Sequence, residues 1–359
     1  MKPLYEKEGK SSFLKGIGPD FIGISLLALF LLLFFNRDAL KGGDLFFFVS
    51  DSFLSVNTIF LSIVIEAIPF ILLGVFFSAL IQIFVHEDMI KRFLPKNAFV
   101  ALLPATLLGA IFPVCECAII PVVRRLIKKG MPLHVGVVFL VAAPILNPVV
   151  FASTFFAFRT DMTVVYSRMI VAFILAIIIG GILYILYKNS NQIRESKATP
   201  HTHIHVHSGH DSQQVSEKSF TQKSIQKLKQ TMYHATDEFF DMGKYLIVGA
   251  FIAALFQTYL DRQILLSIGS DDVSAPLVMM LFAYVLSLCS EADAFVAASF
   301  GSTFSTGSIV AFLVYGPMID LKNTIMYFAY FKKGFVISFI ITVTITVFLA
   351  VMVLQWFFI

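Results

Sequence analysis

The sequence predicts an all-α polytopic membrane protein, built as an inverted repeat of two helical halves with an extra N-terminal span. Three observations support this prediction: the composition, a series of long apolar runs, and a similarity between the two halves. Hydrophobic residues make up 58% of the 359 residues and charged residues 14%, whereas soluble domains average about 45–50% and about 25%. So apolar a chain cannot cover a folded surface with polar groups. This excludes a soluble enzyme, a disordered protein and a nucleic-acid partner.

Long apolar runs define the predicted membrane segments, because about 20 apolar residues cross the hydrocarbon core of a bilayer. The first run follows a basic stretch and has no small-residue cleavage site after it, so we expect a retained span rather than a signal peptide. The predicted domains are residues 1–56 with the first span, a first repeat at 57–187, a cytoplasmic loop at 188–242 and a second repeat at 243–359. The runs are 21–35, 57–84, 98–123, 133–157, 163–187, 243–260, 276–300, 306–331 and 334–357.

The distribution of Lys and Arg selects between two topologies. If every run crosses the membrane, these residues divide almost equally between the two sides. Suppose instead that runs 98–123 and 276–300 enter and leave by the same side. Most Lys and Arg residues then lie on the cytoplasmic side, as is typical of the loops of membrane proteins. We therefore prefer two re-entrant hairpins and a cytoplasmic N-terminus in a bacterial plasma membrane. This count places Arg168 at the outer surface and interprets Arg124, Arg125 and their basic neighbours as anchors at the inner surface.

The two halves of the chain resemble each other at a nearly constant offset of about 174 residues. The segment beginning at Glu66 aligns with the one beginning at Asp241, and both are expected to head a helix. Three further pairs follow in the same order: Gly74 with Gly249, Cys115 with Cys289, and Asn147 with Asp320. With re-entrant hairpins the copies have opposite orientations, as in many secondary transporters, whose substrate sites lie at broken helices near the membrane midplane.

Acid and thiol groups lie halfway along both runs that we predict to be re-entrant. Ionisable groups at this depth are costly and typically functional, so we expect the two hairpin tips to meet and bind cargo. Thiolates prefer soft metal ions and carboxylates harder ones, which extends the expected cargo to metal or metalloid species. The alternative is that the carboxylates hold the tips through backbone N–H groups and the cysteines only pack. The residues are Cys115, Glu116, Cys117, Cys289, Glu291 and Asp293.

Three further polar residues complete the candidate site. Pro148 cannot donate a helical hydrogen bond and must break the fourth run, which frees carbonyl groups and the Asn147 side chain to contact cargo or to form a packing kink. Asp320 occupies the matching position, with Lys322 as a candidate salt-bridge partner. Glu66 is a candidate proton carrier.

A histidine tract lies in the predicted cytoplasmic loop. Neutral imidazoles bind zinc, copper or nickel, so a transition-metal ion such as zinc is the cofactor we expect there. A flexible loop with incidental metal affinity is the alternative. The tract comprises His201, His203, His205, His207 and His210.

Four sequence blocks over residues 57–335 resemble the bacterial YraQ-like predicted permease family, which is related to the ArsP-like organoarsenical efflux permeases. The blocks are FPVCECAIIPVVRRLIKKGMP, VAAPILNPVV, LSLCSEADAFVAASF and FLVYGPMIDLKN. The resemblance implies a permease, a companion membrane subunit and a metal-related cargo. The arsenical-exporting branch is associated with a cysteine-rich first tip; here Glu116 intervenes and the second tip is acidic, which argues against an organoarsenical.

These observations predict a secondary-type transporter or a permease subunit that moves a small solute through the midplane site. The chain has no Walker-type GxxxxGK[ST] segment and no HExxH, so neither ATP hydrolysis nor enzymatic chemistry is expected. The alternative function is a metal-responsive scaffold or sensor subunit of a larger complex. Deleting 199–211 would abolish the function of a sensor but not transport by a permease.

Overall fold

The computed structural model describes residues 51–84, 97–112, 115–188, 192–194, 220–259 and 273–357, with the isolated positions 25, 89, 95, 190 and 271. The predicted first span, apart from residue 25, and the histidine tract lie outside these residues.

The described chain is almost entirely α-helical, as predicted. No strand occurs in the described residues, where Ile193 and Phe331 form an isolated antiparallel β-bridge. The helices are α3 (Asp51–Phe84), α5 (Leu102–Ile111), α6 (Glu116–Lys128), α7 (Leu133–Leu146), α8 (Pro148–Ala157), α9 (Met162–Tyr187), α10 (Phe220–Tyr259), α12 (Ser274–Leu286), α13 (Ser290–Ala298), α14 (Thr306–Met318), α15 (Leu321–Tyr330) and α16 (Lys333–Phe357).

Six helical segments of the described chain are long and apolar enough to cross a membrane. They agree with the six described runs that the preferred topology makes full spans. The two runs predicted to be re-entrant are instead divided into short helices. The six segments are Ser52–Ile81, Leu133–Ala157, Met162–Tyr187, Glu238–Tyr259, Thr306–Tyr330 and Lys333–Phe357.

Each half of the described chain has the same order of elements: a long helix, two pairs of short helices, and a second long helix. The pair α7–α8 breaks at Asn147, which is extended, and Pro148 opens the next helix, where its missing N–H costs nothing. The pair α14–α15 breaks at Ile319 and Asp320. The pair α12–α13 breaks after Ser287, whose φ of 48° lies in the left-handed region.

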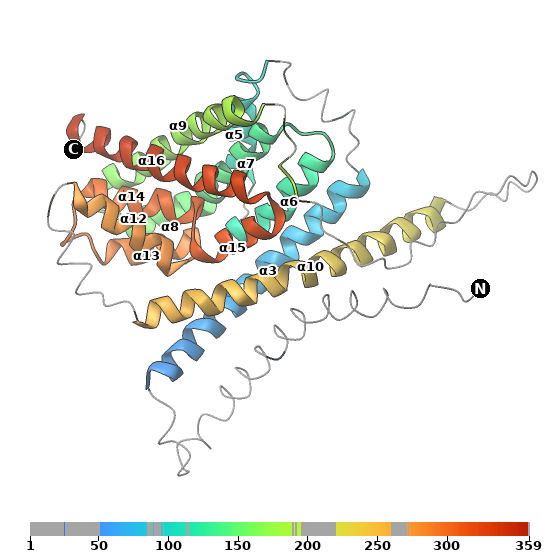
Figure 1. Cartoon of the computed structure of the whole chain (residues 1–359), viewed down its shortest axis with the longest axis horizontal. Coiled ribbons are helices and arrows are strands. Elements are labelled where there is room, and N and C mark those ends of the chain that lie inside the picture. Colours follow the sequence, from blue (N-terminus) through green and yellow to red (C-terminus); the bar gives the residue numbers. More distant parts are fainter. Residues whose placement is uncertain are drawn as a thin grey trace, which may run out of the picture.

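Two glycines allow the long helices to approach the broken ones closely. In Figure 1, α3 and α10 lie side by side along one edge of the bundle. A Cβ on Gly74 would lie 2.5 Å from the Ala118 carbonyl oxygen of α6, and one on Gly249 would lie 3.0 Å from the Lys322 Cα of α15. These matched glycines therefore bring α3 and α10 against the two short helices that carry Glu116 and Lys322.

Two predictions about boundaries are wrong. Helix α10 begins at Phe220, so residues 220–242 of the predicted loop are helical, and the apolar span begins at Glu238. Helix α3 begins at Asp51. Glu66 and Asp241 consequently lie inside helices and do not head them. Hydropathy marks only the apolar part of a helix, whereas the backbone hydrogen bonds of a helix are satisfied internally and let it continue into polar sequence.

Candidate functional site

Carboxylates occupy the N-terminal ends of three short helices. Glu116 is the first residue of α6, Glu291 and Asp293 lie in the first turn of α13, and Asp320 caps α15. The peptide dipoles at a helix N-terminus favour negative charge, which offsets part of the cost of burying these acids. The sequence folds in this way because each acid follows a break in its apolar run.

Lys322 joins two of these acids. Its Nζ donates to Glu116 Oε1 at 3.1 Å, to Asp320 Oδ2 at 2.8 Å and to the Ser287 carbonyl at 2.8 Å. The predicted Asp320–Lys322 salt bridge is thus confirmed, and the structure adds Glu116 as a second partner. Exposed fractions of 2% for Glu116, 0% for Asp320 and 3% for Lys322 place the whole group in the interior.

Arg168 of α9 is fully buried, with an exposed fraction of 0%. Its guanidinium donates to Thr154 Oγ1 of α8 at 2.6 Å and to the Ser290 carbonyl of α13 at 3.1 Å. It also interacts electrostatically with Glu291 and Asp293. The sequence-based count that placed Arg168 at the membrane surface is therefore wrong: tertiary contacts provide the partners that let an arginine remain inside the bundle.

The two acid- and thiol-bearing segments lie near each other. Glu116 of α6 repels Glu291 and Asp293 of α13 electrostatically. The Cys289 thiol hydrogen-bonds the carboxylate of Glu66, which comes from α3. Side chains from three helices of both halves therefore surround one region of the interior.

The thiols lie in the same region. Cys115 and Cys117 are buried and Cys289 is half-buried. The Cys115 and Cys117 side chains are hydrogen-bonded to each other, and Cys117 Sγ also lies 3.6 Å from Asn323 Oδ1. Among the residues that the structure describes, no three His, Cys, Asp or Glu side chains are placed to hold one metal ion.

Asn147 uses its side chain within the break between α7 and α8. Its Nδ2 donates to the Ala143 carbonyl at 3.0 Å, and its Oδ1 accepts from the Val150 N–H at 2.9 Å. This amide thus satisfies both ends of the interrupted helix. The geometry agrees with the packing kink more directly than with contact to cargo.

Asn147→Ala should lower the free energy of unfolding by about 1–2 kcal/mol, because it removes a helix N-cap and leaves a buried carbonyl without its donor. The melting temperature of the purified protein checks this. Asp161→Ala, which removes an N-cap of α9 outside the buried core, should lower it less. Equal losses for the two variants would contradict the prediction.

Several polar atoms at the site are buried without a hydrogen-bond partner. They come from acidic, basic and hydroxyl side chains, which leaves acceptors and donors available to a solute, a proton or water. These atoms are Glu116 Oε2, Glu291 Oε2, Asp293 Oδ2, Ser290 Oγ and Arg168 Nε.

The C-terminal half of α6 contacts the long helix α10 and the short helix α15. Arg125 donates to Glu238 of α10 at 2.7 Å, and Ser78 of α3 donates to the same carboxylate oxygen at 2.8 Å. Arg124 stacks on the Tyr330 ring at 4.4 Å. These two arginines therefore bind neighbouring helices, in addition to their predicted anchoring role.

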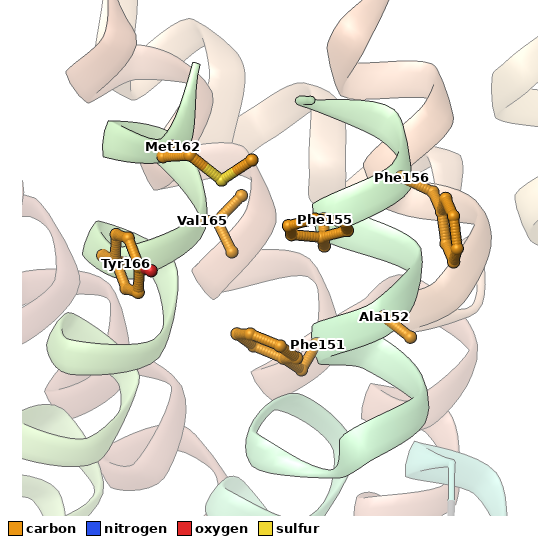
Figure 2. Close-up of a pocket in the computed structure, with 7 residues that line it drawn as sticks. All are labelled: Phe151, Ala152, Phe155, Phe156, Met162, Val165 and Tyr166. Carbon is orange, nitrogen blue, oxygen red and sulfur yellow. The ribbon is translucent and has the colours of Figure 1, made fainter. Parts of the chain in front are cut away.

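An outward-facing groove between α8 and α9 is separate from this site. It is lined by apolar side chains and one tyrosine, and it contains none of the candidate residues (Figure 2). With no charged group it cannot stabilise an ion, so it is consistent with a surface that faces lipid.

The fold and the buried polar centre define a class: a multi-pass α-helical membrane protein with ionisable groups inside the bundle, as in transporters. A family model described as "Predicted permease" (ArsP_1) matches residues 52–356. The chain belongs to this permease family, which agrees with the resemblance found in the sequence and favours a transporter over an enzyme.

Two curated relatives cover most of the chain. The UPF0718 protein YcgR of Bacillus subtilis is 50% identical over 296 residues, which are 82% of this chain and 95% of that protein. A putative two-component membrane permease complex subunit of Streptococcus mutans is 42% identical over 289 residues, or 80% of this chain and 91% of that protein. No solved structure matches.

Sequence reasoning missed Arg168 and Ser290 as members of the buried polar group. A signal for Arg168 was present, because it lies six residues into a 26-residue apolar helix, and intramembrane arginines are rare and typically face a partner. Ser290 carried no comparable signal.

Proposed function

We propose that this protein is a permease, or the permease subunit of a complex, that moves a small solute through the buried site by alternating access. Glu66, Glu116, Glu291, Asp293 and Asp320 bind a cation or carry protons. Cys115, Cys117 and Cys289 add affinity for soft ions, and a metal or metalloid species is the cargo class that fits both kinds of group.

One observation supports this proposal above the others: the buried and half-buried acids of the site outnumber the bases beside them. Glu116 and Asp320 interact with Lys322, Glu291 interacts with Arg168, and Asp293 interacts with both cations. Full ionisation would leave an uncompensated negative charge inside a membrane, which is strongly unfavourable. Protons or a bound cation can remove that excess, and their reversible binding is what a coupled transporter requires.

Contacts along α7 support the re-entrant hairpin and, with it, inverted copies. The backbone of Ala98 is hydrogen-bonded to His134, at the start of α7. Ile127, near the end of α6, packs against Gly136, which lies in the same first turn of α7. Between them, Phe112 reaches Phe139 in the middle of α7. Both ends of the segment thus lie at one end of α7, as expected for a chain that enters and leaves by the same side.

The proposal extends to the membrane, the partner subunit and the metal ion of this permease. The positive-inside tendency supports a cytoplasmic N-terminus and a cytoplasmic histidine tract in a bacterial plasma membrane. The name of the Streptococcus mutans relative supports a companion membrane subunit. Zinc or a similar ion at the histidine tract is proposed from the imidazole spacing alone.

Flux measurements in sealed vesicles test the function. Wild-type protein is reconstituted and compared with Glu116→Gln and Glu291→Gln for a panel of metal ions, metalloids and organic anions. We expect each variant to reduce the flux of the true cargo at least about tenfold, the effect of losing roughly 1.4 kcal/mol of binding or barrier energy.

The control for these measurements is Glu238→Gln, which changes a carboxylate that pairs with Arg125 away from the site. It should retain most of the flux. Unchanged flux in both Glu116→Gln and Glu291→Gln would remove these residues from the transport path.

A further inference from the structure

We propose that the Lys322 ammonium is the resident occupant of a monovalent-cation site, and that a potassium-sized cation from solution replaces it during the transport cycle. This inference rests on the proposed function and deepens it, because it names the ligand class that this part of the site accepts. The cation is the coupling ion or part of the cargo.

The surroundings of the ammonium are those of a small cation. Three oxygen atoms from three separate elements approach Nζ at 2.8–3.1 Å: a carboxylate of α6, the N-cap carboxylate of α15 and the Ser287 carbonyl between α12 and α13. Carboxylate and carbonyl oxygens are the ligands that hard cations take in proteins. A space formed around an ammonium suits an ion of about the same radius.

These oxygens are held by their own elements and not by Lys322. Asp320 Oδ1 accepts from the Asn323 N–H at 2.6 Å, which fixes the carboxylate as a helix cap. Ser287 has a left-handed backbone, and its Oγ accepts from the Leu321 N–H at 3.1 Å. The oxygen atoms should therefore stay in place when the ammonium leaves.

The site also has unused capacity for a cation. Glu116 Oε2 is buried without a hydrogen-bond partner, although the residue is only 2% exposed. Two carboxylates face one ammonium, so the group retains a net negative charge when both are ionised. An incoming cation is consequently attracted to the site before Lys322 has left it.

Lys322 can leave without movement of its backbone. Gly249 of α10 lies directly against the Lys322 Cα and carbonyl oxygen, which fixes this turn of α15. The ammonium lies at the far end of a flexible four-carbon stem, and such a side chain can change rotamer while its backbone stays in place. The exchange is thus a side-chain event that leaves the packing of α10 on α15 intact.

Thermal unfolding of the full-length protein in detergent tests the exchange. Melting temperatures are measured in N-methyl-D-glucamine chloride while potassium chloride replaces it at constant ionic strength. Lys322→Ala should melt lower than the wild type without potassium and rise saturably as potassium is added, because an ion that binds only the folded state stabilises it. The wild type should also respond, but with a midpoint at least about tenfold higher, because its ammonium competes.

Two controls locate the effect. Lys322→Ala combined with Asp320→Asn should lose the potassium response, since one carboxylate of the site is gone. Lys244→Ala removes a lysine that pairs with Asp241 nearer the surface and should respond as the wild type does. If Lys322→Ala cannot be purified, Lys322→Gln is measured by the same criteria.

Either of two results would overturn the proposal. Without a potassium response in the folded Lys322 variant, the oxygen atoms do not form a cation site. With a response in the variant but none in the wild type at any concentration, Lys322 is a permanent structural partner. Neither result depends on flux, so failure of the cation site is distinguished from failure of the permease proposal, which the vesicle measurements test.

Discussion

Replacing Arg168 by leucine should lower the free energy of unfolding by about 3–5 kcal/mol, the usual cost of removing one partner from a buried charged group. Arg168 is fully buried and bonds Thr154 and the Ser290 carbonyl, so both would lose a donor. Glu291 and Asp293 would lose the cation that offsets their charge. The measurement is the unfolding midpoint of the purified protein.

Two comparisons separate charge from packing in this experiment. Arg159→Leu removes an exposed arginine that stacks on Phe156 at 4.7 Å and should cost less than about 1 kcal/mol. Arg168→Leu combined with Asp293→Asn should recover part of the loss, because an unpaired negative charge is removed together with the cation. A double variant no more stable than Arg168→Leu alone would show that the charge interaction contributes nothing.

Gly74→Ala should be the most damaging of the small substitutions, with a loss of about 2–3 kcal/mol, in the upper range for overpacking. The new Cβ would lie 2.5 Å from the carbonyl oxygen and 2.6 Å from the Cα of Ala118. These are backbone atoms, so no side-chain rotation relieves the clash, and α3 must move away from α6. Because α6 begins at Glu116, flux should fall together with the melting temperature.

Gly243→Ala is the matched control. Gly243 lies in α10, and a Cβ there meets nothing within 4 Å. Alanine is the better helix former by about 1 kcal/mol, so this variant should be as stable as the wild type or slightly more stable. Equal melting temperatures for the Gly74→Ala and Gly243→Ala proteins would contradict the close approach of α3 and α6.

Much of the fold was predictable because membrane helices obey strong local constraints. A segment in lipid must satisfy its own backbone hydrogen bonds, so apolar runs of sufficient length identified the six described spans. Pro148 located the break between α7 and α8 for a similar reason, since proline cannot continue a helix. The starts of α3 and α10 were not predictable from hydropathy, because a polar sequence is compatible with either a loop or the end of a helix.

The acids and thiols of the candidate site could be named from the sequence, whereas Arg168, Ser290 and most contacts between the members were missed. The positions of Cys115, Glu116, Cys289 and Glu291 within apolar runs marked them as unusual. The pair formed by Glu116 and Lys322 was not predicted, because these residues are 206 positions apart. No local pattern in either segment indicates a contact with the other. The proposal that Asn147 contacts cargo is weakened by its bonds to Ala143 and Val150.

The order of residues alone indicated a helical membrane protein of the permease family, the approximate positions of its six described spans, and the acids and thiols of the candidate site. These properties follow from hydrophobicity and backbone chemistry, which act over a few neighbouring residues. The folded chain established which charges meet: Lys322 with Glu116 and Asp320, and Arg168 with the first turn of α13. Electrostatic energy depends on distance in space and on burial, and only the packing of distant helices sets these two quantities.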